Sequence, residues 1–490
     1  MFKDLKSKQS FTIAAITFWS QFASYSFSAI LILYLTKSTL DYGLGFSEDQ
    51  AYSFQGVSKA MVYAIIMIGG FMADKYLGLR RSILIGSILL AFSFLVVFIS
   101  GFFVQYGNKV FIYAYASIPA CSSLLMGTSS AMVSKIYRED RVLAKGAMTL
   151  YYMSINLGSL LAFVVAPLLI DYKYGPLAVL GIVFIGKLLA SLNFAWRYKI
   201  YDNVVDNIDK QSISQKSKLI VFSYLLFIYL FTIVCYQYPD QANVILGMVS
   251  VLCLVLFLFR SLFFLEGAAQ IKQIIGLCLI VVAVVFFVIY NQMESTLIMT
   301  AQNNSDLKLL GLSVNPANYQ LINPVIIIFG GMLLIRIYPM LPRFYIPYQF
   351  ATGTALAALG LFMVYFGFLN AHNGIISGNY IALTYLFISI SELFVSAIGL
   401  SMIGIYCDPK MMGFAMGAWY ISASLSNSIT GLVNQLVALP EKGVSILESA
   451  YIYKEYFYTA GLVTLVISMF VFVLAIVIIK FMKIKNIEFV

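Results

Sequence analysis

Long apolar stretches, separated by short polar connections, run through this chain from residue 11 to residue 482. An α-helix needs ~20 consecutive apolar residues to cross the hydrocarbon core of a bilayer, which is ~30 Å thick. Segments of this kind are predicted at 11–36, 52–77, 81–105, 110–136, 143–171, 176–196, 217–236, 242–264, 271–300, 321–338, 349–370, 379–405, 412–437 and 455–482. The pattern therefore predicts an all-α integral membrane protein with fourteen transmembrane helices.

The longest polar connection inside the chain, residues 197–216, separates the first six spans from the remainder. The two spans that follow it, 217–236 and 242–264, are almost uniformly apolar. Such helices have little with which to line a polar cavity, so we interpret them as an inserted, lipid-facing hairpin. The predicted domains are an N-terminal six-helix bundle (1–196), a cytoplasmic linker with the inserted hairpin (197–270) and a C-terminal six-helix bundle (271–490).

Composition and charge support the membrane class. Of the 490 residues, 61% are hydrophobic and 11% are charged, whereas soluble proteins average about 25% charged residues. The net charge of +10 gathers in alternate connections, for example at Arg80 and Arg81 after the second span and at Lys483 and Lys485 after the last. Because Lys and Arg mark cytoplasmic loops, both termini are expected in the cytoplasm, and the charge implies no nucleic-acid partner.

Metal and cofactor chemistry is not expected. Five cysteines lie mostly within apolar spans and show no CxxC spacing, which is typical of small packing residues. The single histidine, His372, lies in a short polar connection, so a histidine-based metal site has no further ligands to use. An enzyme needs acids, nucleophiles or metal ligands gathered at one depth, and the sequence offers no such set.

A glycine pair followed by a basic turn occurs once in each half. Residues 69–82 read GGFMADKYLGLRRS, and residues 330–343 read GGMLLIRIYPMLPR. This fits two parallel six-helix repeats with a substrate site at mid-membrane between them. In the first copy, Asp74 lies at a helix end and is expected to pair with a base or with a helix N-terminus. We therefore predict that Asp74, Arg80 and Arg81 gate the inner face.

The segment GGFMADKYLGLRR resembles the loop signature of the major facilitator superfamily, in the spelling of the proton-dependent oligopeptide transporter family. Four further stretches are similar to motifs of that family and occur in the same order. They are YYMSINLGSLLAFVVAPLL (151–169), NYQLINPVIII (318–328), SELFVSAIGLSM (391–402) and MGAWYISASLSN (416–427). The resemblance covers nearly the whole chain and includes the apolar hairpin that bacterial members carry between the halves.

The resemblance implies a major facilitator fold of twelve core helices plus two. It implies a secondary active transporter that takes up di- or tripeptides, or similar small molecules, with protons by symport. The expected location is the bacterial inner membrane, and the expected assembly is a monomer. Two alternatives remain open: an uncoupled facilitator or exporter of another polar metabolite, and, in a different class, a membrane receptor or channel.

This sequence departs from the family at the charged positions of the pocket. The first-span motif ExxERFxYYG aligns with residues 17–26, where Thr17, Ser20 and Gln21 replace both acids and the arginine. The lysine of the family's fourth span aligns with Met126 of this chain, and the glutamate of the family's seventh span aligns with Asn291. The polar stripe of the first span is therefore interpreted as a pocket wall whose charges have become neutral.

The substrate-binding candidates that remain are polar or aromatic residues at family positions. They are Tyr25, Tyr63, Asn156, Asn291, Gln292, Asn323, Glu392 and Trp419. For the amides the alternative role is an interhelical hydrogen bond, and for the aromatic residues it is ordinary packing. Glu392 is the candidate for proton coupling, because a carboxyl group in the middle of a span is costly and functional by default.

Two lysines are candidates for a relocated cation. Lys59 lies one helical turn before Tyr63, and Lys187 lies deep in the sixth span. The alternatives are snorkelling of Lys59 towards the outer interface and a tie from Lys187 to a backbone carbonyl of another helix. Glu294 lies near the end of its predicted span and is interpreted as marking that end.

Overall fold

The computed structural model describes residues 4–137, 141–205, 207–337, 340–341, 343–408, 412–440 and 444–487. The chain divides into two compact units. Unit 1 contains Met1–Phe46 and Met61–Ala242, and unit 2 contains Ser47–Ala60 and Asn243–Val490. Each unit is described by itself below.

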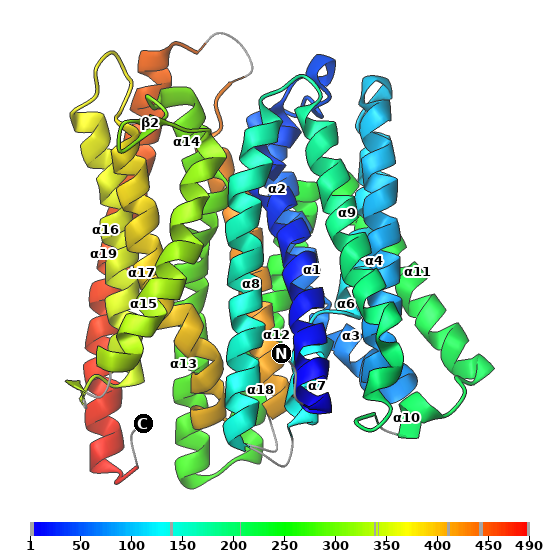
Figure 1. Cartoon of the computed structure of the whole chain (residues 1–490). Coiled ribbons are helices and arrows are strands. Elements are labelled where there is room, and N and C mark those ends of the chain that lie inside the picture. The colour runs from blue at the N-terminus through cyan, green and yellow to red at the C-terminus, as the bar shows by residue number, and fades with distance from the viewer. Residues whose placement is uncertain are drawn as a thin grey trace. The chain divides into compact units, whose positions relative to one another are not determined.

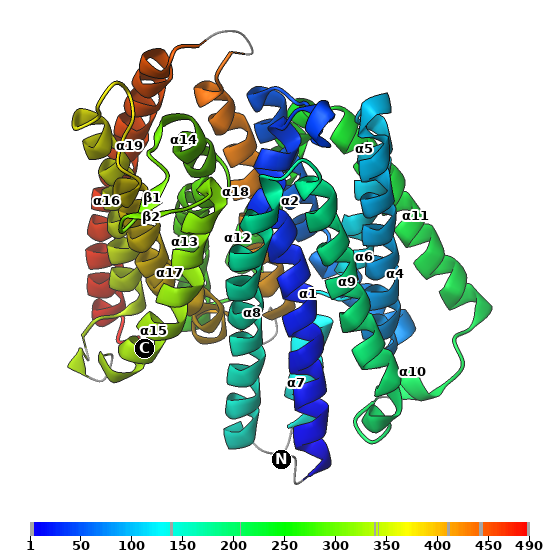
Figure 2. The ribbon, with the colours of Figure 1, turned by 45° about the horizontal axis from the view of Figure 1, so that its top comes forward.

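Unit 1 is a helical bundle whose long members are continuous (Figure 1). These are α1 (Leu5–Thr36), α4 (Leu79–Ser100), α8 (Arg141–Ile170), α9 (Gly175–Trp196) and α11 (Gln215–Gln237). The shorter elements are η1 (Thr39–Asp41), α3 (Ile66–Met72), η2 (Ala73–Leu77), η3 (Gly101–Tyr106), α5 (Lys109–Tyr115), α6 (Ser117–Ser123), α7 (Thr128–Ile136), η4 (Tyr198–Tyr201) and α10 (Asn207–Lys210). Helix α1 packs against α8 and α9, and α9 packs against α4, as Figure 2 shows.

Unit 2 is a second helical bundle, and residues 48–60 of α2 (Glu48–Ala64) belong to it. Its other elements are α12 (Pro239–Phe264, from Asn243), α13 (Gly267–Tyr290), η5 (Asn291–Glu294), α14 (Thr296–Asn304), η6 (Pro316–Leu321), α15 (Ile322–Ile337), α16 (Ile346–Leu369), α17 (Gly378–Tyr406), α18 (Met412–Val433), η9 (Asn434–Val437) and α19 (Ile446–Ile484). A small hairpin pairs β1 (Lys308–Leu309) with β2 (Leu312–Ser313). Helix α16 packs against α17 and α19, beside which it lies in Figure 1.

The predicted spans match the helices closely. Within the described residues, thirteen helical segments are long and apolar enough to cross a membrane, and each overlaps one predicted span. The one predicted span without such a segment, 412–437, contains helix α18, which is less apolar because it carries Ser422, Ser424, Ser426 and Ser428. All four of these serines are buried. A membrane helix with this composition suits the polar interior of a bundle and not its lipid surface.

The predicted hairpin corresponds to α11 and α12. Only 33% of the most apolar window of each helix is buried, as expected for helices that face lipid. Two polar contacts depart from the uniformly apolar interpretation. Tyr224 of α11 shares a hydrogen bond of 2.8 Å with Ser123 in unit 1, and the fully buried Asn243 of α12 donates to the carbonyl oxygen of Ser53 at 2.9 Å in unit 2. Each of these polar groups has a partner in its own unit, as a polar group away from water requires. The lipid-facing insertion stays a prediction.

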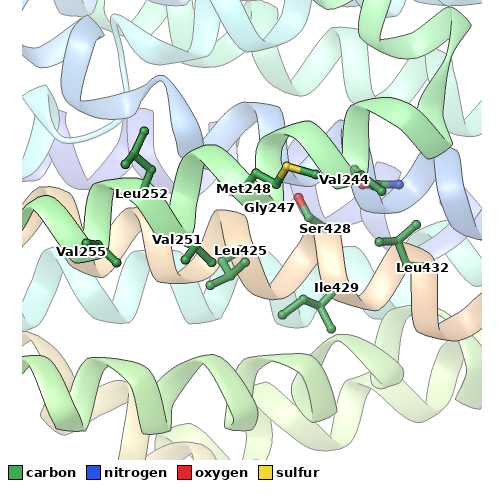
Figure 3. Close-up of a pocket in the computed structure, with 11 residues that line it drawn as sticks. Val244, Gly247, Met248, Val251, Leu252, Val255, Leu425, Ser428, Ile429 and Leu432 are labelled. Carbon is green, nitrogen blue, oxygen red and sulfur yellow. The ribbon is translucent and has the colours of Figure 1, made fainter.

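An apolar groove of about 590 Å³ lies between α12 and α18 in unit 2 (Figure 3). Helix α12 contributes Val244, Met248 and Val251, and helix α18 contributes Leu425 and Ile429. Aliphatic side chains offer a polar solute no hydrogen bonds. This groove therefore does not suit a polar substrate.

The glycine pairs of the two halves have the same division of roles. A Cβ atom on Gly69 of α3 would lie 2.2 Å from the backbone oxygen of Ser123 in α6, whereas a Cβ on Gly70 would meet nothing within 4 Å. In unit 2, a Cβ on Gly330 would lie 2.6 Å from Leu393, and a Cβ on Gly331 would again meet nothing within 4 Å. The first glycine of each pair therefore permits close helix packing. This likeness supports the parallel repeat.

The two glycines of the first pair give a matched test of this packing. The Gly69→Ala variant is expected to lose about 1–3 kcal/mol of stability, because the added methyl group overlaps the backbone of α6. The Gly70→Ala variant is the control and is expected to keep wild-type stability. Thermal unfolding in detergent, followed by size-exclusion chromatography, measures both. Equal melting temperatures for the two variants would contradict the assigned close contact.

Candidate functional site

The basic residues of the inner-loop motif hold the connection that follows α9. Arg80 forms an ion pair with Asp202, and its guanidinium lies 4.2 Å from the ring centroid of Tyr198. Arg81 donates to the carbonyl oxygen of Ile208 at 3.0 Å. These contacts fix residues 198–205 and 207–211 to the N-terminal end of α4, all within unit 1.

The acid Asp209 caps the N-terminus of helix α4. The carboxylate of Asp209 accepts the N–H groups of Arg80 at 3.3 Å and of Arg81 at 3.1 Å. An acid at a helix N-terminus satisfies free N–H groups and favours the helix dipole. Gly78 precedes the helix at φ +83°, and a Cβ there would lie 2.4 Å from the Asp209 carboxyl group. Asp74 itself is exposed in the π-helical turn η2, so its gating role stays a prediction.

The polar stripe of the first span faces a lysine. Lys187 of α9 is 3% exposed. Its Nζ donates to the carbonyl oxygen of Ser20 at 2.7 Å, to Ser20 Oγ at 2.9 Å and to Ser24 Oγ at 2.6 Å. Part of the stripe thus binds this amino group within the bundle, which corrects the interpretation of the stripe as a pocket wall alone. The bond to the Ser20 carbonyl is the backbone tie that was the alternative role for Lys187.

The remaining candidates in unit 1 lie on α1, α2 and α8. Asn156 is 8% exposed and donates to the carbonyl oxygen of Tyr152 at 3.0 Å, one turn earlier in α8. The rings of Tyr25 and Phe163 meet edge to face, with their centroids 5.6 Å apart. Tyr63 is half-buried on α2. Tyr25 and Tyr63 therefore keep accessible surface, whereas the amide of Asn156 is largely used by its own helix.

Gly158 in the INLGS motif of α8 allows close helix packing. A Cβ on Gly158 would lie 2.7 Å from the carbonyl oxygen of Phe18 in α1. Helices α1 and α8 therefore touch backbone to backbone at this position, as small residues allow in membrane proteins. This contact fixes the position of α1 beside the candidate residues.

The segment that carries Asn291 and Gln292 is a break in a long helix. Helix α13 ends at Tyr290, and α14 begins at Thr296 after the 3-10 turn η5. Gln292 Oε1 accepts from Thr296 Oγ1 at 2.5 Å and from the Tyr456 hydroxyl at 2.9 Å. Asn291 donates to Thr430 Oγ1 at 3.3 Å. Irregular backbone at membrane depth requires such protein partners, so both amides stabilise the break.

Lys59 forms an ion pair with Glu294, which lies in this break. The two side chains are 18% and 15% exposed. Gln55, one turn before Lys59 on α2, donates to the carbonyl oxygen of Glu294 at 2.7 Å. Glu294 does not mark the end of its span, because α14 continues to Asn304. Lys59 is therefore half of a partly buried charge pair and does not simply snorkel to an interface.

A small polar cavity of about 10 Å³ adjoins this charge pair. It is lined by Tyr52, Gln55, Gly56, Lys59, Asn291, Ser295, Asn427, Thr430 and Asn434. A cavity needs about 10–15 Å³ to hold one water molecule. This cavity is therefore too small for a peptide, and its residues form a polar contact between α2, η5 and α18.

Glu392 and Asn323 come together in unit 2. The amide of Asn323 in α15 donates to Glu392 Oε2 at 2.6 Å and to Ser389 Oγ at 3.2 Å. Both Glu392 and Asn323 are half-buried. Among the ion pairs of the described residues none involves Glu392. The site therefore presents a carboxyl group in the middle of α17, positioned by an amide.

Trp419 is a packed residue. Its side chain is 5% exposed, and its ring meets Phe287 edge to face at 5.6 Å. A Cβ on Gly399 of α17 would lie 1.9 Å from the indole ring, so this glycine leaves room for it. Trp419 fixes the spacing of α13, α17 and α18 beside Glu392. Any contact with substrate remains a prediction for this side chain.

Sequence reasoning missed several partners. Ser20, Glu294, Asp209 and Asn243 each bind a group more than 100 residues away in sequence. Each is a polar residue in or next to an apolar run, and this position was the only feature in the sequence that could have marked it as a bonding partner. Within the described residues, no group of three His, Cys, Asp or Glu side chains gathers in a way that suits a metal ion.

Comparison with known proteins identifies the family. The sequence model of the POT family matches residues 80–451. The dipeptide and tripeptide permease A of Chromobacterium violaceum is 31% identical over 471 residues, which are 96% of this chain and 93% of the permease. The dipeptide and tripeptide permease B of Aeromonas hydrophila is 30% identical over 469 residues, 94% of this chain and 91% of the permease. The chain belongs to the POT family.

Solved structures show the same fold. The structure of tetrameric PepTSo2 has a TM-score of 0.84 at 26% identity, with 98% of this chain and 99% of that chain covered. A bacterial homologue of the human drug peptide transporters PepT1 and PepT2 has a TM-score of 0.83 at 25% identity, with the same coverage. The expected fold class and family are therefore confirmed. The chain is a multi-pass membrane transporter and not an enzyme, receptor or channel.

Proposed function

We propose that this transporter takes up dipeptides and tripeptides, or small molecules that resemble them, together with protons. The curated relatives are named as dipeptide and tripeptide permeases. The observation that carries the proton-coupled part is the half-buried Glu392, held by Asn323 in the middle of α17. A carboxyl group at that depth is costly to keep and is a proton-relay candidate.

The substrate contacts follow from accessibility. In unit 2, Asn291, Asn323 and Glu392 are the polar candidates with accessible surface, and in unit 1 they are Tyr25 and Tyr63. The buried candidates, Asn156, Gln292 and Trp419, are proposed to shape the pocket through their bonds and packing. Because the first-span arginine and fourth-span lysine positions hold Gln21 and Met126, neutral and cationic peptides are the proposed cargo.

The proposed setting is the bacterial inner membrane, with both termini in the cytoplasm. The support is the excess of Lys and Arg in alternate connections. A monomer is the proposed functional unit, although one structural relative is described as tetrameric. Light scattering of the detergent complex, corrected for bound detergent, measures this state.

Reconstitution into proteoliposomes tests the function. Uptake of labelled alanyl-alanine is expected to exceed its equilibrium level when the lumen is made alkaline, because inward proton flow then drives accumulation. A protonophore should abolish the accumulation but leave exchange of labelled for unlabelled peptide intact. If uptake ignores imposed gradients between about pH 5 and pH 8, the protein is an uncoupled facilitator. Absence of both uptake and exchange would overturn peptide transport itself.

A further inference from the structure

A buried lysine in unit 1 has no part in the mechanism outlined so far. Lys187 lies in the middle of α9, where three oxygen atoms of α1 surround its amino group at 2.6–2.9 Å. The ring centroid of Phe94 in α4 lies 5.5 Å from Nζ. The oxygen atoms around the amino group therefore come from two adjacent turns of α1.

No carboxylate of the surrounding helices balances a charge at this position. The helices that pack against α9 are α1, α4 and α8, and none of these four helices contains Asp or Glu. The titratable groups on the packed elements are Lys6, Lys8, Tyr25 and Tyr34 of α1, Arg80 and Arg81 of α4, Arg141, Lys145, Tyr151 and Tyr152 of α8, Tyr106 of η3, and Tyr198, Lys199 and Tyr201 of η4. An ammonium group without a counter-ion is disfavoured inside a membrane protein.

The three oxygen atoms suit both charge states of the amine. A protonated lysine has three N–H donors, and the carbonyl oxygen and two hydroxyl groups accept all three. A neutral amine has two donors and one lone pair, and a serine hydroxyl can turn to donate to that lone pair. Gain or loss of a proton therefore leaves no buried donor unpaired.

We propose that Lys187, with Ser20 and Ser24, is a proton-binding site of the transport cycle, additional to Glu392. The neutral amine takes one proton from water to become an ammonium group, and it returns that proton to water later in the cycle. Ser24 is half-buried, so it is the member of the site through which water reaches the amine. This inference rests on the proposed proton-coupled function. A purely structural tie between α1 and α9 is the competing role.

The ratio of protons to peptides distinguishes these roles. In proteoliposomes with a trapped pH dye and labelled alanyl-alanine, the Lys187→Met variant is expected to move about one proton fewer per peptide than the wild type. Counterflow exchange, which needs no net proton movement, should stay within about threefold of the wild type. A variant that folds, exchanges and keeps the wild-type ratio would overturn the proton site.

A second variant keeps the lysine and removes its hydroxyl partners. The Ser20→Ala, Ser24→Ala double variant should need about tenfold higher proton concentration for half-maximal uptake, because the ammonium form loses two acceptors. The matched control is Ser26→Ala, since Ser26 is a fully buried serine of α1 whose hydroxyl has no hydrogen-bond partner among the described residues. An unchanged pH profile in the double variant would overturn the inference, including in the case where the Lys187→Met variant does not fold.

The same assay separates failure of this inference from failure of the proposed function. A wild-type protein that moves no protons but exchanges peptide would refute both proton sites and leave peptide transport standing. A coupled wild type with an equally coupled Lys187→Met variant would refute the lysine site alone.

Discussion

The Glu392→Gln variant is expected to lose proton-driven accumulation of a dipeptide while it retains exchange. Glutamine keeps the size of the side chain and its hydrogen bonding to Asn323, but it cannot release or bind a proton at neutral pH. The imposed pH gradient then has no carboxyl group beside Asn323 on which to act. Accumulation should therefore fall by at least about tenfold, while counterflow persists.

The measurement compares gradient-driven uptake and counterflow in the same proteoliposome preparation. Glu448→Gln is the control, because Glu448 is an exposed acid near the start of α19. It should match the wild type in both assays. If Glu392→Gln still accumulates peptide against its gradient, Glu392 is not required for coupling. Loss of exchange together with accumulation would instead assign this side chain to substrate binding.

Removal of Lys59 alone is expected to produce the largest loss of stability. The Lys59→Met variant leaves the Glu294 carboxylate partly buried without its cation, and breaking a buried pair from one side costs about 3–5 kcal/mol. The Lys59→Met, Glu294→Gln double variant removes both charges and should recover most of that loss. Thermal melting of the wild type, both single variants and the double variant gives the coupling energy.

A surface pair provides the comparison. Lys454 and Glu455 lie 3.8 Å apart with 32% and 50% exposed side chains, so Lys454→Met should cost less than about 1 kcal/mol. If the double variant of Lys59 and Glu294 is no more stable than Lys59→Met, the two charges are not energetically coupled.

Hydropathy predicted the helices because the bilayer imposes a length and an apolar surface on each span. The match extends to α18, whose serines lower its apolar character without changing its helical form. The family positions pointed to Asn323 and Glu392 as candidates, and the structure adds that Asn323 Nδ2 lies 2.6 Å from Glu392 Oε2. The helices and the candidate residues could therefore be predicted from the hydropathy pattern and from the order of the family motifs.

The sequence alone could not predict which charged residues pair with one another. Lys59 and Glu294 are separated by 235 residues, and neither their spacing nor their depth shows that α2 meets the break after α13. Lys187 was visible as a deep cation, but its partners are serines, which occur in many spans. In the same way, Asp209 was one of several acids in a polar connection, and nothing local distinguished it as the cap of α4. Such contacts depend on tertiary packing, which one sequence does not specify.

The docking of residues 198–205 and 207–211 on α4 has a consequence for the order of events during synthesis. The backbone N–H groups of Arg80 and Arg81 receive their cap only after Asp209 has left the ribosome. All the described partners of these two arginines lie before residue 212. The N-terminal end of α4 can therefore complete its bonds while the second half of the chain is still being made. A translational pause just after this segment would give the first bundle time to close before the next helices enter the bilayer.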